Sequence, residues 1–215
     1  MNTADNTQQK DSPFKPTAGF ILYSGVKRCF DFSFAVLLLI LAALPCAFIA
    51  AAIKLTSKGN VIFKQKRVGR YGKIFYCYKF RTMYSNAPKY CATANLNHAD
   101  SYITPVGKIL RKTSLDEIPQ IINVLKGDMS FIGPRPLIPD EQYIHTQRKN
   151  KGVYRLRPGI SGLAQINGRD LVSPDKKVEF DYKYLQSIGF KTDFVIFFKT
   201  IIGVLCKNDV VDNID

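Results

Sequence analysis

The longest apolar run of the sequence occupies residues 32–53, a stretch of 22 residues without a charged side chain. That length is sufficient for a helix to cross the hydrocarbon layer of a bilayer. Pro45 stands near the middle of the run, where a proline removes a backbone hydrogen bond and bends a helix. Basic residues, which favour the cytoplasmic side of a membrane, flank the run at both ends: Lys27, Arg28, Lys54 and Lys58. The pattern predicts a re-entrant helix over residues 26–58 that bends at Pro45 and returns to the side it entered from.

Two other interpretations of this run stay open at the level of sequence. A conventional kinked transmembrane helix has the same length and composition, and the core helix of a soluble protein can be equally apolar. The run does not fit a secretory signal peptide, because it begins late and no small-residue cleavage site follows it. Residues 1–25 precede the predicted membrane helix. Polar residues dominate them up to residue 16, so we expect a flexible tail.

From residue 59 onward the pattern is that of a soluble domain. The segment NVIFKQKRVGRYGKIFYCYKFRTM alternates apolar and basic residues around its glycines, which predicts two strands joined by a turn. The later segments are a loop over 85–100, helical patterning over 104–125 with a break near Thr113, a turn-rich stretch over 127–139, a helix over 141–151, a loop over 157–169, a helix over 176–186 and an apolar segment over 194–206. The last segment is too short to span a bilayer and either packs on the core or lies at a membrane surface. We therefore predict an α/β fold, strictly a mixed α+β fold with a small antiparallel sheet, in one domain over residues 59–215.

The chain carries a formal net charge of +14. A surplus of this size is typical of proteins with anionic partners such as nucleic acid, anionic lipid or phosphorylated ligands. The charge is local, because no acidic residue lies between Asp31 and Asp100. Ten basic residues lie in that interval: Lys54, Lys58, Lys64, Lys66, Arg67, Arg70, Lys73, Lys79, Arg81 and Lys89. The positive segment thus begins where the apolar run ends.

Cysteine and histidine argue against two kinds of site. The five cysteines form no CxxC pair and show no metal-ligand spacing, so we expect free thiols in a reducing compartment. His98 and His145 stand far apart in the sequence, which argues against a histidine-based zinc site.

The segment RKTSLDEIPQIINVL carries two adjacent carboxylates, Asp116 and Glu117. With Ser114 as the N-cap the segment forms an ordinary capping box, but Pro119 then removes a hydrogen bond inside the helix. With Asp116 as the N-cap, Pro119 falls in the first turn, where a missing N–H costs nothing. The second register places the carboxylate pair at a helix N-terminus, which would keep Asp116 ionised and attract phosphate. A purely structural helix start and a functional site remain open.

An acidic pair in a basic protein fits a pyrophosphate substrate. Lysine and arginine neutralise phosphate oxygens, and a carboxylate holds a divalent ion that bridges them. Arg111 precedes Asp116 by about one and a half helical turns, and strand alternation predicts that Lys79 and Arg81 share a face. Each of these basic residues alone is more typical of a solvated surface, so their clustering with the acidic pair is the prediction to test.

Four blocks of the sequence resemble the bacterial sugar transferase family, the monotopic phosphoglycosyl transferases that begin lipid-linked glycan assembly. In chain order the blocks are VKRCFDFSFAVLLL, LTSKGNVIFKQKRVGRYGKIFYCYKFRTM, LRKTSLDEIPQIINVLKGDMSFIGPRPL and RPGISGLAQINGR. They cover most of residues 26–205. The resemblance is to the minimal catalytic form, without the multi-span N-terminal region of larger relatives.

The resemblance implies a two-step reaction. Asp116 would act as the nucleophile on a UDP-sugar, releasing UMP and keeping the phosphosugar, and undecaprenyl phosphate or another polyprenol phosphate would then accept it. Glu117 would bind Mg²⁺. Covalent catalysis in two displacements implies ping-pong kinetics. The reaction would be the first membrane step in the assembly of a bacterial glycan such as a capsule, O-antigen, exopolysaccharide or glycoprotein.

The resemblance also implies substrate contacts and a location. Basic residues in the family's motifs are assigned to phosphate or nucleotide binding: Lys79, Arg81, Arg111 and Arg135. In GPRP, two prolines would hold a rigid turn that aims Arg135. Gln165 and Arg169, in AQINGR, would bind substrate too. A re-entrant helix broken at Pro45 would place the site on the cytoplasmic face of the bacterial inner membrane, with no nucleic acid as partner; a homodimer is left open.

The chain departs from the family pattern at two informative places. Leu44 stands where many relatives have a serine before the helix-breaking proline. The chain has no tryptophan, and Pro174 lies near the position where relatives often carry one after the INGR motif. The second difference lies in a region that bears on substrate choice, so the sequence does not identify the sugar.

Two alternatives to a transferase use part of the same evidence. A nucleic-acid-binding module would explain the basic run with its interleaved aromatic residues, Tyr71, Phe75, Tyr76, Tyr78 and Phe80. It explains neither the apolar run nor the acidic pair. A non-catalytic membrane scaffold would explain the apolar run and the charge, and it predicts that Asp116→Asn leaves function intact.

Overall fold

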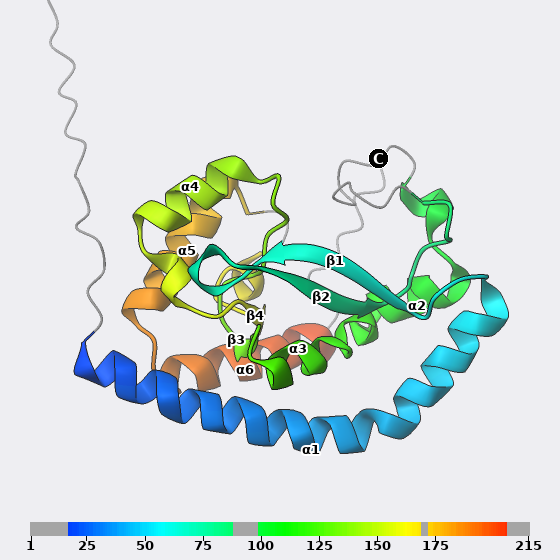
Figure 1. Ribbon diagram of the computed structural model, residues 1–215, viewed down its shortest axis with the longest axis horizontal. Coiled ribbons are helices and arrows are strands. Elements are labelled where there is room, and N and C mark those ends of the chain that lie inside the picture. Colours follow the sequence, from blue (N-terminus) through cyan, green and yellow to red (C-terminus); the bar gives the residue numbers. More distant parts are fainter. Residues whose placement is uncertain (1–16, 88–98, 169–171, 206–215) are drawn as a thin grey trace, which may run out of the picture.

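The computed structural model describes residues 17–87, 99–168 and 172–205 (Figure 1). One long helix, α1, forms the base of the molecule, and a β hairpin crosses above it. Shorter helices and a second pair of strands fill the space between and beside them. The mixed α+β fold expected from the sequence is confirmed.

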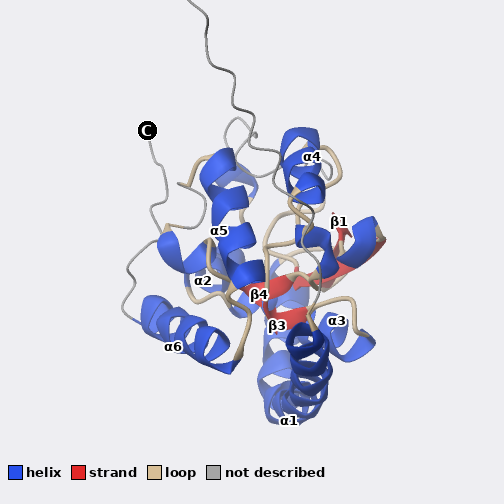
Figure 2. Cartoon of the chain, turned by 90° about the vertical axis from the view of Figure 1, so that its left-hand side faces the viewer, coloured by secondary structure: helices blue, strands red, loops and turns tan. Residues whose placement is uncertain are grey.

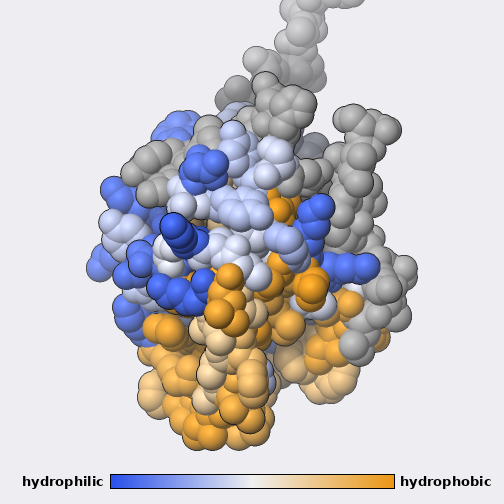
Figure 3. Space-filling view, turned by 90° about the vertical axis from the view of Figure 1, so that its right-hand side faces the viewer, coloured by the Kyte–Doolittle hydropathy of each residue, from blue (hydrophilic) through white to orange (hydrophobic). Residues whose placement is uncertain are grey.

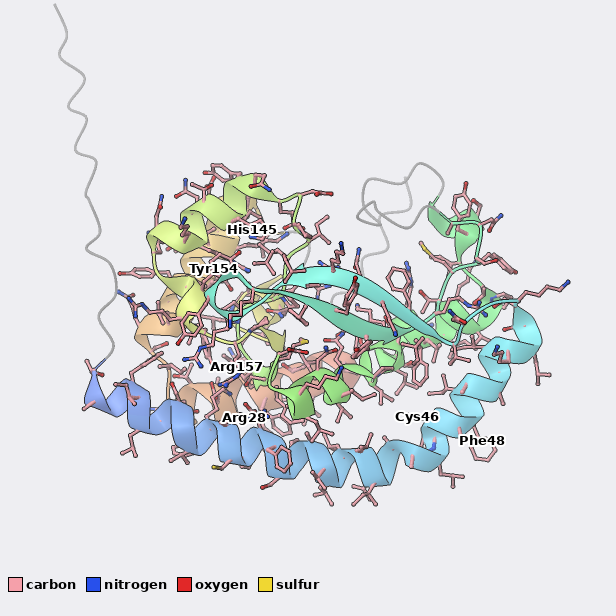
Figure 4. The ribbon with its side chains drawn as sticks, viewed as in Figure 1. Arg28, Cys46, Phe48, His145, Tyr154 and Arg157 are labelled. Carbon is pink, nitrogen blue, oxygen red and sulfur yellow. The ribbon has the colours of Figure 1, made fainter. Side chains whose placement is uncertain are left out.

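Helix α1 runs from Ala18 to Thr56 without interruption. It begins before the expected boundary at residue 26, because Thr17 accepts a hydrogen bond from the backbone N–H of Phe20 at 3.2 Å and so caps the first turn. Pro45 lies inside the helix, and the helix bends in this region, close to Cys46 (Figures 1 and 4). The two arms of the predicted re-entrant segment are therefore one bent, continuous helix.

The apolar part of α1 is largely exposed. By length and composition α1 could cross a membrane, and only 6% of its most apolar window is buried against the rest of the molecule. Exposed side chains along it include Leu37, Ile40, Leu41, Leu44 and Phe48. A core helix of a soluble domain would bury these residues, so the exposure argues against that interpretation.

The predicted hairpin is confirmed. Strands β1 (Ile62–Val68) and β2 (Ile74–Phe80) pair antiparallel, with Phe63 opposite Lys79 and Arg67 opposite Phe75. The turn between them uses a left-handed conformation at Tyr71, with a φ of 58°. Because directly opposite residues point to the same face, Arg67 and Lys79 lie on one side of the hairpin.

Helix α3 (Gln120–Lys126) packs between the hairpin and α1. Its Asn123 is fully buried; the side-chain oxygen accepts from Tyr78 N at 3.0 Å, and the amide donates to Tyr76 O at 2.7 Å. These bonds supply hydrogen-bond partners to two backbone groups on the edge of β2 that faces away from β1. On its other side α3 contacts α1, where Ala35 is completely buried in the same apolar cluster as Ile121. Asn123 thereby fixes the hairpin relative to the base of the molecule.

A second, two-stranded sheet was not expected. Strands β3 (Ser130–Ile132) and β4 (Gly159–Ser161) pair parallel, and they come from two segments that the sequence suggested were turns or loops. Their backbones meet at glycines: a Cβ on Gly159 would lie 2.1 Å from Gly133 N. Short strands held by such close approach lack the alternating apolar pattern that predicts a strand.

The remaining helices follow the predicted pattern. They are α2 (Pro105–Lys112), α4 (Gln142–Asn150), α5 (Pro174–Gln186) and α6 (Phe190–Leu205), and α2 ends at the break expected near Thr113. Helix α6 lies beside α1 at the base (Figure 2). It buries Ile196 in the core and exposes Phe194, Phe198 and Ile202. Hydrophobic residues consequently gather along the base, with hydrophilic residues above them (Figure 3).

Candidate active site

The carboxylate pair lies on a tight turn before α3. Leu115–Glu117 form a short 3₁₀ turn that begins after Ser114, whose φ of 56° is left-handed. Helix α3 starts at Gln120 with Pro119 as its N-cap. The proline is at the helix start, as the second register required. Neither Ser114 nor Asp116 caps α3, however, so both predicted registers were wrong, because the 3₁₀ turn intervenes.

Lys79, at the end of β2, holds the carboxylate pair. Its Nζ lies 2.6 Å from Glu117 Oε1 and 3.8 Å from Asp116 Oδ2. The three side chains are partly buried, with exposed fractions of 25%, 22% and 12% for Lys79, Glu117 and Asp116. The clustering of a lysine with the acidic pair, which the sequence could only suggest, is therefore present.

Burial controls the protonation of Asp116. Loss of hydration raises the pKa of this carboxyl above its usual range, Lys79 opposes the shift most strongly, and the charge of Glu117 adds to it. Arg111 also lowers the pKa. We expected the α3 dipole to keep Asp116 ionised, but the carboxylate instead depends on neighbouring cations, chiefly Lys79.

Two side chains on the Lys79 face of the hairpin were not singled out by the sequence. Arg67 donates to Pro136 O at 3.1 Å and to Gln65 Oε1 at 2.6 Å, and it is partly buried. Burial lowers the pKa of Arg67, and the nearby positive charge of Arg135 lowers it further. Cys77 lies on this face between them; burial raises the pKa of its thiol, while Lys79 and Arg67 lower it. Positively charged side chains thus gather on the face of the hairpin that carries Lys79.

The GPRP turn brings Arg135 to this set. Arg67 holds the turn at Pro136 O, and Val68 N donates to Leu137 O at 2.9 Å. From the other side, Arg148 donates to the carbonyl of Arg135 at 2.9 Å while its guanidinium pairs with buried Asp181 at 2.5 Å. Side-chain contacts as well as the prolines therefore hold the turn, and the aiming of Arg135 at a substrate stays a prediction.

The other predicted site residues are distributed unevenly. Arg111 donates to Thr82 Oγ1 at 3.0 Å and lies close enough to influence Asp116. Arg81 lies just after β2, and its guanidinium donates to Lys58 O at 2.6 Å and Ser57 O at 2.7 Å, so in this structure it caps the end of α1. It does not share the Lys79 cluster as strand alternation suggested.

Gln165 is buried beside α6, and its amide nitrogen and oxygen have no hydrogen-bond partner among the described residues. Arg169 lies outside the described residues.

The site stands over the bend of α1. Ile118, two residues after Asp116, packs against two of the apolar clusters that involve this helix. One cluster contains Leu38, before Pro45, and the other contains Ile49, after it. The acidic turn is therefore anchored on both arms of the helix at once.

The carboxylate pair fits Mg²⁺ chemically. Carboxylate oxygens are hard ligands, and Mg²⁺ commonly takes one or two of them together with water and substrate phosphates. In the described parts of the chain, no group of three or more His, Cys, Asp or Glu side chains gathers into a metal cage. Asp116 and Glu117 supply two such carboxylates.

Two useful positions, Arg67 and Asn123, had a weak signal in the sequence. Counting alternate residues back from Lys79 through the hairpin turn would have placed Arg67 on the same face as Lys79. Asn123 is a single polar residue in an otherwise apolar stretch, IINVL, and such a residue is buried only when its amide has partners. Both depend on a pairing register that the sequence alone left undetermined.

Comparison with known proteins shows which family the chain resembles. The family model described as bacterial sugar transferase matches residues 22–207. The uncharacterized sugar transferase EpsL of Bacillus subtilis is 39% identical over 185 residues, covering 86% of this chain and 90% of the relative. The exopolysaccharide production protein ExoY of Sinorhizobium fredii is 35% identical, covering 94% and 93%. The UDP-glucose:undecaprenyl-phosphate glucose-1-phosphate transferase of Escherichia coli is 41% identical over 184 residues, covering 82% of this chain but 39% of the relative.

The match to the family model includes most of α1, the hairpin, the acidic turn and the GPRP turn. The family model spans well over half of the chain, and two relatives of similar length align almost from end to end. The chain belongs to the bacterial sugar transferase family.

Proposed function

We propose that this protein transfers a sugar 1-phosphate from a UDP-sugar to undecaprenyl phosphate. The name of the E. coli relative describes this reaction for glucose. The observation that carries the proposal is the Lys79–Asp116–Glu117 cluster, placed directly over the bend of a largely exposed apolar helix. A water-soluble nucleotide sugar and a membrane-bound acceptor have to meet at such a position.

In the first step, an Asp116 carboxylate oxygen attacks the phosphorus next to the sugar. The new bond is the acyl phosphate between Asp116 and the sugar phosphate, and the broken bond is the P–O bond to the uridine phosphate, which leaves as UMP. Attack requires the ionised carboxylate. Because burial raises the pKa of Asp116 and Lys79 lowers it, Lys79 maintains the reactive form.

In the second step, a phosphate oxygen of undecaprenyl phosphate attacks the same phosphorus. The acyl phosphate bond breaks, Asp116 is regenerated as a carboxylate, and the product is undecaprenyl diphosphosugar. The acceptor reaches the site from the membrane, which requires the acidic turn to lie close to the bilayer. The packing of Ile118 against both arms of α1 supports that placement.

The surrounding cations neutralise the phosphate charge. Lys79 and Arg111 lie next to Asp116, and Arg67 and Arg135 extend the positive surface along the hairpin. Glu117, with Asp116, would hold Mg²⁺, and the ion would supply charge neutralisation at the pyrophosphate. Gln165, Arg81 and Arg169 stay predictions as substrate contacts, and in this structure Arg81 is already engaged by α1.

The shape of α1 supports a re-entrant position in the membrane. Its convex side faces away from the domain, and both ends rise toward the domain (Figure 1). Many apolar side chains of α1 are exposed, and hydrophobic residues gather along the base (Figure 3). Lys27 and Arg28 lie near one end and Lys54 and Lys58 near the other. We propose that the bend enters the cytoplasmic leaflet of the inner membrane and that the domain lies on the cytoplasmic face.

The test uses full-length protein in nanodiscs with undecaprenyl phosphate, Mg²⁺ and a panel of UDP-sugars. UMP release is measured for wild type, Asp116→Asn and the matched control Asp140→Asn, which changes an exposed aspartate. We expect lipid-dependent UMP release that Asp116→Asn reduces by at least about 10³-fold, while the control stays within about twofold of wild type. Intact mass should show a phosphosugar adduct on wild type when the lipid is omitted, and none on Asp116→Asn.

Three results would contradict this proposal. Full activity of Asp116→Asn would remove Asp116 as nucleophile. Absence of UMP release by wild type, together with glycan assembly in cells that Asp116→Asn leaves intact, would identify a non-catalytic scaffold. UMP release that is equal with and without undecaprenyl phosphate would identify a hydrolase instead of a transferase.

A further inference from the structure

A second positively charged site lies far along α1 from the bend. A recess opens between the N-terminal half of α1 and the domain. Its charged lining comprises five basic side chains and one acidic side chain: Lys27, Arg28, Arg70, Arg155, Arg157 and Asp31. Arg28 and Arg157 lie close together here, between α1 and the domain (Figure 4). None of the arginines belongs to the site at Asp116.

The arginines of this recess contact carbonyl oxygens. Arg28 donates to Val124 O at 2.6 Å and Leu125 O at 2.9 Å, and Arg157 Nε donates to Gly127 O at 2.9 Å. Arg70 Nε donates to the backbone carbonyl of Arg155 at 2.8 Å. Carbonyl oxygens carry partial charges only, so these bonds orient the guanidinium groups without neutralising them.

Carboxylates do not neutralise them either. In the described ranges, the ion pairs involve Lys27, Lys79 and Arg148, and none joins a carboxylate to the four arginines of the recess. Asp31 lies 4.0 Å from Lys27. The crowding is sufficient for Arg70 and Arg28 to lower the pKa of Arg157 beyond the effect of burial. Five basic side chains gathered around a single carboxylate, Asp31, favour an anion with several oxygens.

The recess lies at a defined height above the apolar base. The same turns of α1 expose Leu22, Val26 and Phe30, and the start of α6 exposes Phe190. A helix is roughly 10–12 Å wide with its side chains, so the recess is about one helix diameter from the apolar surface. If α1 rests in the membrane as proposed above, this is the depth of the lipid phosphates. Basic pockets beside membrane helices on the cytoplasmic side bind anionic headgroups.

We propose that the recess at Arg28, Arg70, Arg155 and Arg157 binds the phosphate of an anionic membrane lipid. The site is separate from the one at Asp116 and holds the N-terminal half of α1 at the membrane surface. A bilayer lipid is favoured over a soluble phosphate because the recess adjoins exposed apolar side chains that contact acyl chains. The membrane position rests on the proposed function, whereas the anion site depends only on the arginines.

The experiment titrates full-length protein in an uncharged detergent with dihexanoyl phosphatidylglycerol, dihexanoyl phosphatidylcholine or inorganic phosphate. The saturable rise in Tm gives an apparent Kd. The test variant is Arg70→Gln/Arg155→Gln. The matched control is Lys149→Gln/Lys176→Gln, which removes two exposed charges, one from α4 and one from the first turn of α5, neither of which lines the recess (Figure 1). Arg70→Lys/Arg155→Lys retains the charge.

We expect phosphatidylglycerol, but not phosphatidylcholine, to stabilise wild type. The test variant should weaken the apparent Kd by roughly 25-fold, because each basic residue near an anionic lipid contributes on the order of fivefold. The control should change it by less than about twofold, and the lysine variant should recover most of the affinity. If the double variant folds poorly, Arg155→Gln alone should weaken binding about fivefold.

Three results would overturn the proposal. Equal weakening in the control would show a response to net charge alone, and unchanged affinity in the test variant would exclude the recess. Inorganic phosphate that binds as tightly, with the same dependence on Arg70 and Arg155, would identify a soluble-anion site. No UDP-sugar is present, so failure here leaves the transfer reaction standing, and failure of UMP release leaves this result standing.

Discussion

The two ends of helix α3 carry opposite charges. Asp116 and Glu117 precede its first turn and are held by Lys79, whereas Arg28 and Arg157 donate to carbonyl oxygens at its last turn. Both arrangements are favourable for the helix, since acids stabilise its N-terminal end and bases its C-terminal end. The difference lies in the neighbours. Lys79 balances the acidic turn, but no carboxylate among the described residues pairs with Arg70, Arg155 or Arg157.

This difference separates a site suited to chemistry from a site suited to binding. At the acidic turn, opposing charges adjust the ionisation of one buried carboxylate, as a nucleophile requires. At the recess, several positive side chains lie close together and favour the binding of an external anion. Variants that affect one end of α3 and leave the other intact therefore test the comparison directly.

The largest effect is expected from Lys79→Gln. Loss of this ammonium removes the main influence that lowers the pKa of Asp116 and removes a cation from the substrate phosphates. We expect kcat/KM for UMP release to fall by about 10²–10³-fold, in the range found when one charge-stabilising donor is lost. The phosphatidylglycerol titration should be unchanged.

Lys64→Gln is the matched control for this variant, because Lys64 is an exposed lysine on the same hairpin that stacks over Tyr78 at 5.7 Å. It should retain activity within about twofold of wild type. An equal loss in both variants would mean that the hairpin responds to charge in general and that Lys79 has no special role.

The second effect concerns the connection between α3 and the hairpin. Asn123→Leu keeps the number and branching of the side-chain heavy atoms but leaves Tyr78 N and Tyr76 O without their partner. We expect the free energy of unfolding to fall by about 2–4 kcal/mol, because two buried backbone groups lose hydrogen bonds. Urea denaturation measures the change, with the exposed Asn150→Leu as control. Activity should fall with stability, since β2 positions Lys79. An unchanged midpoint would show that water replaces the amide.

Asn123 also shows where sequence reasoning reaches its limit. The bent apolar helix, the hairpin, the break near Thr113 and the helices α4 and α5 follow from periodicity and breaker residues, which are local properties. The acidic pair could be proposed from its own chemistry. The pairing of β3 with β4, the engagement of Arg81 by the end of α1 and the contact of Arg67 with Pro136 could not, because each depends on contacts between segments far apart in the chain. Local patterns carry little information about such contacts.

The third effect distinguishes the recess by its response to alkaline pH. Tyr184 lines the recess; burial first, and then Asp193, which accepts its hydroxyl at 2.6 Å, raises the pKa of Tyr184 well above its usual value. Below about pH 10 both folded and unfolded states keep the proton, so pH has no effect through this group. Above it the unfolded state releases a proton that the folded state retains, and stability falls by up to about 1.4 kcal/mol per pH unit.

Tyr184→Phe should therefore make the decline in stability above about pH 10 shallower than in wild type. Urea unfolding at several pH values from neutral to alkaline measures the slope, and Tyr76→Phe, on the exposed face of the hairpin, is the control. A slope that Tyr184→Phe leaves unchanged would show that the buried hydroxyl does not retain its proton.

The smallest effect is expected from Arg157, which participates in both the structure of α3 and the proposed lipid site. Arg157→Gln removes the bond from Nε to Gly127 O and should lower the free energy of unfolding by about 1 kcal/mol. It should also weaken phosphatidylglycerol binding by about fivefold. Arg157→Lys separates the two roles, because it retains the charge but not the planar fork that reaches the carbonyl. Lysine should therefore restore lipid binding without restoring stability, as measured by urea denaturation beside the lipid titration. The opposite result, in which lysine restores stability but not lipid binding, would reverse these two roles. Lipid binding would then require the guanidinium geometry, and the C-terminal end of α3 would require only a positive charge.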